Sequence, residues 1–201
     1  MGETKRGALI IFEGLDRSGK STQYLRSKGR TVEFIPFPDR STPIGKLIDM
    51  YLRREIDMSE EALHLLFCAN RRERVDFIQE CISTGIDVVC DRYAYSGVAY
   101  SLAKGLPADW VRAGDVGMPQ PDVVLFFEVS PEVACQRGGF GEERLETGEL
   151  QRKVRETMKL LRKPFWQMVN ADGDVQTVEG EVRAIVDHLD LHLPLQLLDQ
   201  I

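Results

Sequence analysis

Short runs of apolar residues alternate along the chain with stretches whose apolar positions recur every three or four residues. The apolar runs have the length of buried strands and lie at residues 8–13, 31–36, 86–91, 122–129 and 166–170. The stretches between them have helical spacing, and this alternation is typical of a parallel sheet covered by helices on both faces. We therefore predict an α/β fold with three layers, α/β/α, around a five-stranded parallel sheet. No repeat or low-complexity linker divides the chain, so residues 1–201 are expected to form a single domain.

Stop signals and apolar stripes set the limits of the predicted helices. One long helix is expected from about residue 59 to residue 84, because its apolar stripe continues until Gly85 ends it. Two more amphipathic helices are expected over residues 149–162 and 177–192. Residues 193–201 are apolar enough to dock on the body of the protein.

The first apolar run leads into GLDRSGKST, residues 14–22, which contains the pattern G-x-x-x-x-G-K-S. A glycine-rich loop between a strand and a helix can surround phosphate with backbone N–H groups and a helix N-terminus, so we expect a nucleoside triphosphate to bind. Lys20 would contact the outer phosphates, and the Ser21 hydroxyl would be a ligand of Mg²⁺. The candidate ATP-binding residues of this loop are Gly14, Arg17, Ser18, Gly19, Lys20, Ser21 and Thr22. Only residues 20–28 remain for the following helix, which is short for a crossover between parallel strands.

Charged residues follow two further apolar runs, at the end where doubly wound sheets bind ligands. Phe37 and Pro38 end the second run, and Arg40 would lie in the loop after them. Asp91 ends the third run, in the position from which a carboxylate of a phosphate-loop protein reaches magnesium or its waters. Arg92 would point into the same crevice and grip a second phosphate. The alternative for Asp91 and Arg92 is an ordinary ion pair between a strand and its loop.

Phe67, Asn70, Arg71 and Arg74 lie three or four residues apart, so a helix would present them on one face. An aromatic ring beside an arginine and an amide can stack a flat base and bond its edge. Taken alone, the pattern favours the alternative, a core aromatic with solvated arginines beside it. Gly97, inside a helical stretch, costs about 1 kcal/mol relative to alanine and so indicates the close approach of a ligand or backbone.

Residues 136–148 combine glycines with Arg137 and Arg144 and have little apolar content. Such a segment suits a lid that closes over a phosphate site, and a plain surface loop is the alternative. Asp174 follows the fifth apolar run and could border the adenine of ATP.

Composition and charge limit the partners. A net charge of −6 argues against broad contact with nucleic acid, and no apolar run is long enough for a membrane span. The cysteines show no C-x-x-C pairing and sit in apolar stretches, which argues against zinc and for buried thiols in a reducing compartment. We therefore expect a cytoplasmic protein without nucleic-acid or membrane partners.

Several segments, taken in order, resemble the thymidylate kinase family of phosphate-loop nucleoside-monophosphate kinases. They are GLDRSGKST, FPDRSTPIGK, HLLFCANRRE, DRYAYSGVAYS, PQPDVVLFFEV and RGGFGEER, and they extend over nearly the whole chain. The resemblance implies that the chain makes dTDP from dTMP and ATP with Mg²⁺. It also implies a homodimer, and a lid at residues 136–148.

The resemblance implies roles for individual residues as well. Asp16 is similar to the carboxylate that accepts the sugar 3′-hydroxyl of dTMP. Arg17 is similar to the catalytic arginine of the subtype that carries it in the phosphate loop. Arg40 and Arg92 match residues that hold the dTMP phosphate, and Phe67 matches the platform that stacks thymine.

Arg71 matches the donor to thymine O4, and Tyr100 matches the aromatic residue that crowds the 2′ position of the sugar. The predicted catalytic residues are Arg17, Lys20, Asp91 and Arg92. The residues predicted to bind dTMP are Asp16, Phe37, Pro38, Arg40, Leu52, Phe67, Asn70, Arg71, Arg92, Ser96, Gly97 and Tyr100. The metal ligands would be Ser21 and Asp91. Leu145 departs from the pattern, because close eukaryotic relatives carry a tyrosine after the lid arginine.

Two other functions remain open at this point. A deoxynucleoside kinase of the same architecture would need a carboxylate base for a neutral hydroxyl, whereas Arg40 with Arg92 suits an acceptor that is already an anion. A nucleotide-gated switch that hydrolyses ATP slowly would not need an acceptor site.

Overall fold

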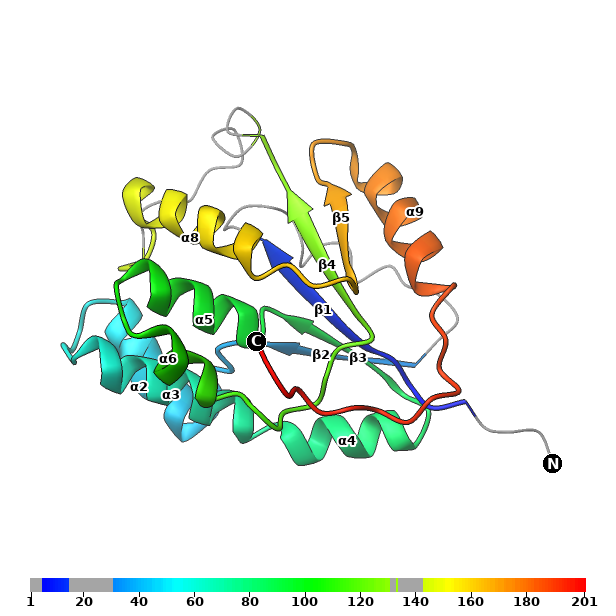
Figure 1. Ribbon diagram of the computed structural model, residues 1–201, viewed down its shortest axis with the longest axis horizontal. Coiled ribbons are helices and arrows are strands. Elements are labelled where there is room, and N and C mark those ends of the chain that lie inside the picture. The colour runs from blue at the N-terminus through cyan, green and yellow to red at the C-terminus, as the bar shows by residue number, and fades with distance from the viewer. Residues whose placement is uncertain (1–4, 15–30, 131–132, 134–142) are drawn as a thin grey trace.

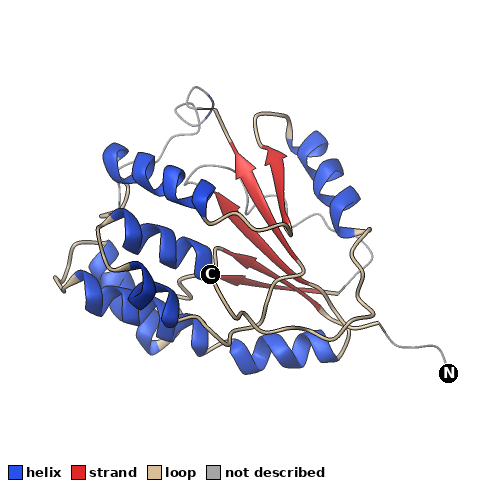
Figure 2. Ribbon diagram, in the orientation of Figure 1, coloured by secondary structure: helices blue, strands red, loops and turns tan. Residues whose placement is uncertain are grey.

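The computed structural model describes residues 5–14, 31–130, 133 and 143–201. Its centre is a sheet of five parallel strands in the order β2-β3-β1-β4-β5 (Figures 1 and 2). The strands are β1 (Leu9–Gly14), β2 (Val32–Pro36), β3 (Asp87–Asp91), β4 (Val123–Glu128) and β5 (Trp166–Asn170). Each strand coincides with one of the apolar runs, so the predicted parallel sheet is confirmed.

Helices cover both faces of the sheet (Figure 1). The described helices are α2 (Pro43–Leu52), α3 (Glu60–Arg72), α4 (Val75–Ser83), α5 (Ala94–Ala103), α6 (Ala108–Ala113), α8 (Gly148–Leu160) and α9 (Val175–Val186). Helices α4, α5 and α8 contribute to the core on one face, and α9 packs on the other. This is the predicted three-layer arrangement.

Strand β1 shows how the sequence builds two cores from one strand. Leu9 and Ile11 point into the core with α4, α5 and α8, whereas Ile10 and Phe12 point into the core with α9. Successive side chains of a strand face opposite sides of the sheet, so a run that is apolar at every position is buried on both.

The predicted single helix over residues 59–84 is wrong, because the chain forms two helices, α3 and α4, that meet at Glu73 and Arg74. No glycine or proline marks this break. Arg74 is instead held by a tertiary contact, in which its Nε donates to an Asp39 carboxylate oxygen at 2.6 Å. Contacts with the loop after β2 therefore turn the chain where local propensity would have continued the helix.

The C-terminal region also differs from the prediction. Helix α9 ends at Val186, several residues before the predicted end, and a turn brings Leu191 into the core. The tail then docks as expected: Leu198 and Ile201 are buried. Leu198 exchanges backbone hydrogen bonds with Gly117 and Met118, both at 2.7 Å.

All strands run in the same direction, so their carboxyl ends lie along one edge of the sheet, the edge at which such folds bind ligands. Among the helices that the structure describes, none combines the length and the apolar character that a membrane crossing requires.

Candidate active site

A cavity of about 290 Å³ opens beside the carboxyl ends of β2 and β3. Its walls come from the loop after β2, from α3 and α5, and from residues 143–146. The predicted dTMP-binding residues on its walls are Phe37, Pro38, Arg40, Leu52, Phe67, Arg71, Arg92, Ser96, Gly97 and Tyr100, and Asp91 lines it too. The fold thus brings residues from distant parts of the chain into one cavity.

Asn70 is the described exception, because it is fully buried and does not line the cavity. Its side-chain oxygen accepts from the Asp39 N–H at 2.7 Å, and its amide donates to the Asp39 carbonyl at 3.2 Å and the Thr42 hydroxyl at 2.9 Å. Asn70 therefore fastens the loop after β2 to α3, and the face proposed from the sequence divides into cavity residues and loop-holding residues.

Arg40 extends from this loop and links two acidic side chains across the cavity wall. Its guanidinium donates to Asp49 on α2 and to Glu143, each at 2.6 Å. Because α2 begins with the Thr42 hydroxyl accepting from the Gly45 N–H, the loop and the helix form one unit that carries Arg40. The guanidinium is thus held at the cavity wall, where an incoming anion could accept from its N–H groups that do not bond Asp49 or Glu143.

Arg92 follows β3 in a left-handed backbone conformation, with φ of 68°. This conformation costs an L-residue about 1 kcal/mol, and here it directs the side chain toward the cavity. The guanidinium donates to the Ser96 hydroxyl at 3.1 Å and lies 5.6 Å from the centre of the Tyr100 ring. The backbone N–H of Arg92 donates to the Phe12 carbonyl of β1 at 2.8 Å, which ties this strained residue to the central strand.

Glu13, on β1, supports Arg92 from behind, and sequence reasoning missed it. Its carboxylate is completely buried and accepts from the Tyr93 and Ser96 N–H groups at 3.0 and 3.1 Å and from the Ser96 hydroxyl at 2.5 Å. Burial raises the pKa of the Glu13 carboxyl, although the hydrogen bonds from Ser96 and the charge of Arg92 act against the rise. The signal in the sequence that could have identified Glu13 is that it is a single acidic residue inside an otherwise apolar strand.

Gly97 allows Arg71 to reach the cavity. A Cβ at position 97 would lie 2.6 Å from the Arg71 Nη2 atom and 2.8 Å from Nη1. The group that approaches Gly97 is therefore an arginine side chain of α3, whereas the sequence had suggested a ligand or backbone. Arg71 itself is almost fully buried but lines the cavity, so its guanidinium is screened from bulk water there.

The described part of the predicted lid, residues 143–148, is anchored on α2. The Arg144 N–H donates to the Leu52 carbonyl at 3.0 Å, and its guanidinium pairs with Asp57 and lies 4.3 Å from the centre of the Tyr51 ring. Leu145 packs against the apolar cluster of α2 and α3 and lines the cavity. Where relatives were expected to place a tyrosine, this chain thus presents an apolar wall.

Several predicted residues lie outside the described residues. These are Asp16, Arg17, Ser18, Gly19, Lys20, Ser21, Thr22 and Arg137, together with the short helix expected over 20–28. Gly14 ends β1 with φ of 152°, a conformation that favours glycine. Asp174 follows β5 at the same sheet edge and caps α9 by accepting from the Thr177 N–H at 2.8 Å.

The family model for thymidylate kinase matches residues 12–182, which is most of the chain. The chain belongs to the thymidylate kinase family. It is 57% identical to the thymidylate kinase of Caenorhabditis elegans over 99% of both chains, and 43% identical to the human enzyme of that name over 90% of both. A thymidylate kinase structure from Candida albicans superposes with a TM-score of 0.89 at 37% identity, covering 96% of this chain and 98% of that one.

Membership of the thymidylate kinase family confirms the predicted fold and the predicted activity, the phosphorylation of dTMP. The roles of single residues remain predictions, since the comparisons concern whole chains. Within the described ranges, no three or more His, Cys, Asp or Glu side chains come together as a metal-binding group.

Proposed function

We propose that the cavity binds dTMP and that the loop after β1 presents the γ-phosphate of ATP to it. The observation that carries this proposal is the combination, in one cavity, of an aromatic side chain, a buried arginine and two further arginines: Phe67, Arg71, Arg40 and Arg92. Phe67 would stack on thymine and Arg71 would donate to its O4 atom. Arg40 and Arg92 would hold the phosphate, and Tyr100 would crowd the sugar where a ribose carries its 2′-hydroxyl.

The acceptor in this reaction is a phosphate oxygen that is already an anion, so the site needs no strong general base. Catalysis then consists of positioning and charge neutralisation. Arg40 and Arg92 would reduce the repulsion between the two phosphate groups. In the loop after β1, Asp16 would accept the sugar 3′-hydroxyl, and Arg17 and Lys20 would neutralise the transferred group.

We also propose that Mg²⁺ accompanies ATP, held by Ser21 and by Asp91 directly or through water. Asp91 fits this role, because it places a carboxylate, the hard oxygen ligand that Mg²⁺ prefers, on the cavity wall where the strand ends. When bound, the ion would neutralise phosphate charge. On the ATP side, Asp174 and the lid residue Arg137 are proposed to contact the nucleotide.

The test is the rate of ADP release measured with dTMP, with thymidine and without an acceptor. We expect release to depend on dTMP. Turnover of thymidine in its place would favour a nucleoside kinase, and a rate that ignores both acceptors would favour a slow nucleotide-gated switch.

The arginine roles are tested by Arg92→Ala. It should raise KM for dTMP and lower turnover, each by roughly 10- to 100-fold, the value of a hydrogen bond to a charged group. Arg152→Ala is the matched control, because Arg152 lies on α8, pairs with Glu156 and does not line the cavity. Equal kinetics for the two variants would contradict the role of Arg92.

We further propose that the protein is a homodimer that pairs through α3 and α6. These neighbouring helices, joined by a His64–Trp110 ring contact of 5.0 Å, expose Leu65, Trp110 and, just beyond α6, Val116. Sedimentation should give twice the mass of the chain, and Leu65→Glu should give the monomer. A monomeric wild type at micromolar concentration would contradict the proposal.

We propose a cytoplasmic protein whose residues 1–201 act as one domain with a lid at 136–148. The buried free thiols of Cys68, Cys81 and Cys90 support a reducing compartment. Cell fractionation tests the location.

Limited proteolysis tests the domain assignment, because a single domain with a lid should be cut first within 136–148.

A further inference from the structure

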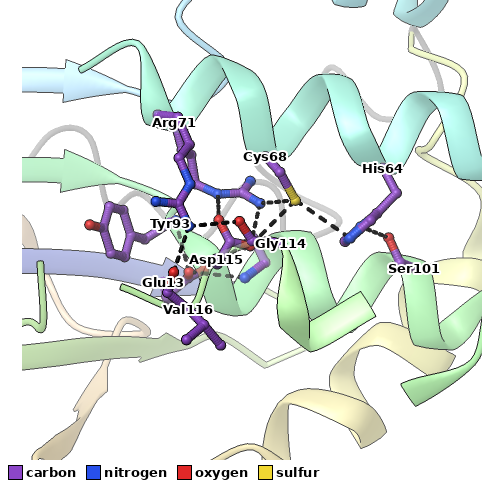
Figure 3. Close-up of polar contacts among 11 residues, drawn as sticks. Glu13, His64, Cys68, Arg71, Tyr93, Ser101, Gly114, Asp115 and Val116 are labelled. Carbon is purple, nitrogen blue, oxygen red and sulfur yellow. Dashed lines mark hydrogen bonds and ion pairs between the residues drawn. The ribbon is translucent and has the colours of Figure 1, made fainter. Parts of the chain in front are cut away.

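Asp115 lies outside the predicted site, yet it binds one of the residues that line the cavity. It follows α6 and is completely buried. Its two carboxylate oxygens accept from Nε and Nη2 of Arg71, each at 2.7 Å, and the Arg71 side chain is only 3% exposed (Figure 3). A two-point bond of this kind fixes the plane of the guanidinium as well as its position.

The segment that carries Asp115 is itself fixed from two sides. Gly114 packs against α3 so closely that a Cβ there would lie 2.6 Å from the Cys68 sulfur. Arg72, from the next position on α3, donates to the carbonyl oxygens of Gly114 and Val116 at 3.1 and 2.5 Å. The carboxylate is therefore part of a rigid support and is not a loosely placed counter-ion.

The remaining neighbours of this pair complete a buried polar network. The Cys68 sulfur lies 3.4 Å from Arg71 Nη2 and from His64 Nε2, and His64 Nδ1 lies 2.8 Å from the Ser101 hydroxyl (Figure 3). Burial, followed by the charge of Arg71, lowers the pKa of His64, so this environment favours the neutral imidazole. Arg71 is thus the cation that Asp115 balances here.

We infer that Asp115 is a positioning residue for base selection, and that it holds Arg71 so that this side chain offers the base edge an N–H donor. The inference rests on the proposed placement of the base against Phe67 and Arg71. It predicts preference for a pyrimidine monophosphate with a carbonyl at C4 over one with an amino group there.

The donor inventory of arginine gives the physical reason. A guanidinium has five N–H groups and cannot accept. Asp115 occupies Nε and one side of Nη2, whereas Nη1 lies beside Gly97 on the cavity wall and bonds no acceptor among the residues that the structure describes. A C4 carbonyl can accept from such a donor. A C4 amino group would face it donor to donor and lose its hydrogen bond with water, and sites of this type discriminate strongly.

The test compares kcat/KM for dTMP with kcat/KM for deoxycytidine monophosphate in wild type and in Asp115→Asn. The asparagine keeps one acceptor oxygen but places an amide N–H₂ where the second oxygen was, so the two-point bond to Arg71 is lost. We expect the selectivity for dTMP to fall roughly 10- to 100-fold, with KM for dTMP raised more than kcat is lowered.

The matched control is Asp122→Asn. Asp122 also binds an arginine through both oxygens, with Arg6 Nη1 and Nη2 at 2.8 and 2.6 Å, but it lies before β4 and away from the cavity. This variant should lose stability and keep the base selectivity. Equal loss of selectivity in both variants would show a general effect of destabilisation and overturn the inference.

Gly97→Ala keeps the test decisive if Asp115→Asn does not fold. It keeps both charged residues and improves helix propensity, but its Cβ would lie 2.6 Å from Arg71 Nη2, the atom that bonds Asp115, and so would push the guanidinium out of the position that Asp115 sets. We expect the same fall in selectivity. Selectivity unchanged in either folded variant would overturn the role of Asp115, whereas a wild type without dTMP-dependent turnover would instead overturn the proposed function.

Discussion

Glu13 offers the sharpest test of how the central strand supports the cavity. Its carboxylate accepts from the N–H of Tyr93, the N-cap residue of α5, and from the N–H of Ser96 in the first turn, whereas the Tyr93 side chain makes no capping bond. Both of these backbone bonds go to one oxygen, Oε1, whereas the Ser96 hydroxyl donates to the other. The roles of the two oxygens can therefore be tested separately by substitution.

Glu13→Gln keeps an oxygen for the two backbone groups, and Glu13→Leu removes both acceptors. A buried N–H left without a partner costs about 1–3 kcal/mol, so the leucine variant should lose roughly 2–6 kcal/mol of the free energy of unfolding. The glutamine variant should stay within about 1 kcal/mol of wild type, because it also avoids burying a charge. Urea denaturation at pH 7 and 25 °C measures both values.

The pH dependence adds a second measurement with a definite sign. Burial raises the pKa of Glu13 above the ordinary glutamate value of 4.5, so the folded state holds this proton more tightly than the unfolded state. The stability that this provides is complete below pH 4.5 and is lost as the pH rises through the folded-state pKa. The wild type should therefore lose stability relative to Glu13→Gln as the pH rises from 4.5.

The kinetic consequence follows through Ser96, which accepts from Arg92 while it donates to Glu13. In Glu13→Gln this orientation is lost, so KM for dTMP should rise although the fold is intact. Equal stability of the leucine and glutamine variants would refute the capping role, and an unchanged KM in the glutamine variant would refute the support of Arg92.

Three further substitutions probe separate parts of the structure. Asn70→Leu should raise KM for dTMP and lower stability by roughly 1–3 kcal/mol, because it releases Asp39 from α3; steady-state kinetics and a thermal melt decide. Leu198→Ala should cost about 2–5 kcal/mol in urea denaturation, whereas the exposed Leu160→Ala should change stability by less than about 0.5 kcal/mol; equal effects would mean that the tail does not dock. Leu145→Tyr should lower KM for dTMP by adding a hydroxyl at the cavity wall, and a raised KM would show that the apolar packing matters more.

The sheet was predictable because its three inner strands, β1, β3 and β4, are apolar on both faces, a pattern typical of a parallel sheet covered on both sides. The break between α3 and α4 was not, since it depends on the ion pair of Arg74 with Asp39, residues distant in sequence. Gly97 was correctly singled out, but its neighbour could not be named until the packing of α3 against α5 was known. Local signals locate the unusual residue, and tertiary contacts decide what it meets.

Most of the cavity residues were identified through the family resemblance. The sequence pattern alone could not decide whether the helix face with Phe67 and Arg71 binds a base or only packs in the core. The resemblance did not reveal the residues behind the cavity. Glu13 and Asp115 do not line the cavity, and each acts through a cavity residue that is distant from it in sequence, Ser96 and Arg71 respectively. Such supporting residues become visible only when hydrogen bonds are traced back from the cavity walls.

The position of β1 between β3 and β4 has a consequence for the timescale of local opening. Its amides are paired on both sides, so they should be among the slowest to exchange with deuterium, whereas β2 and β5 at the edges should exchange sooner. The loop that carries the phosphate-binding motif therefore follows the central strand, whose amides should open slowly. The residues after β2, which hold Arg40, start from an edge strand that opens more readily. We therefore expect the phosphate-binding loop to be attached to slowly exchanging backbone, and the loop that carries Arg40 to be attached to backbone that exchanges sooner.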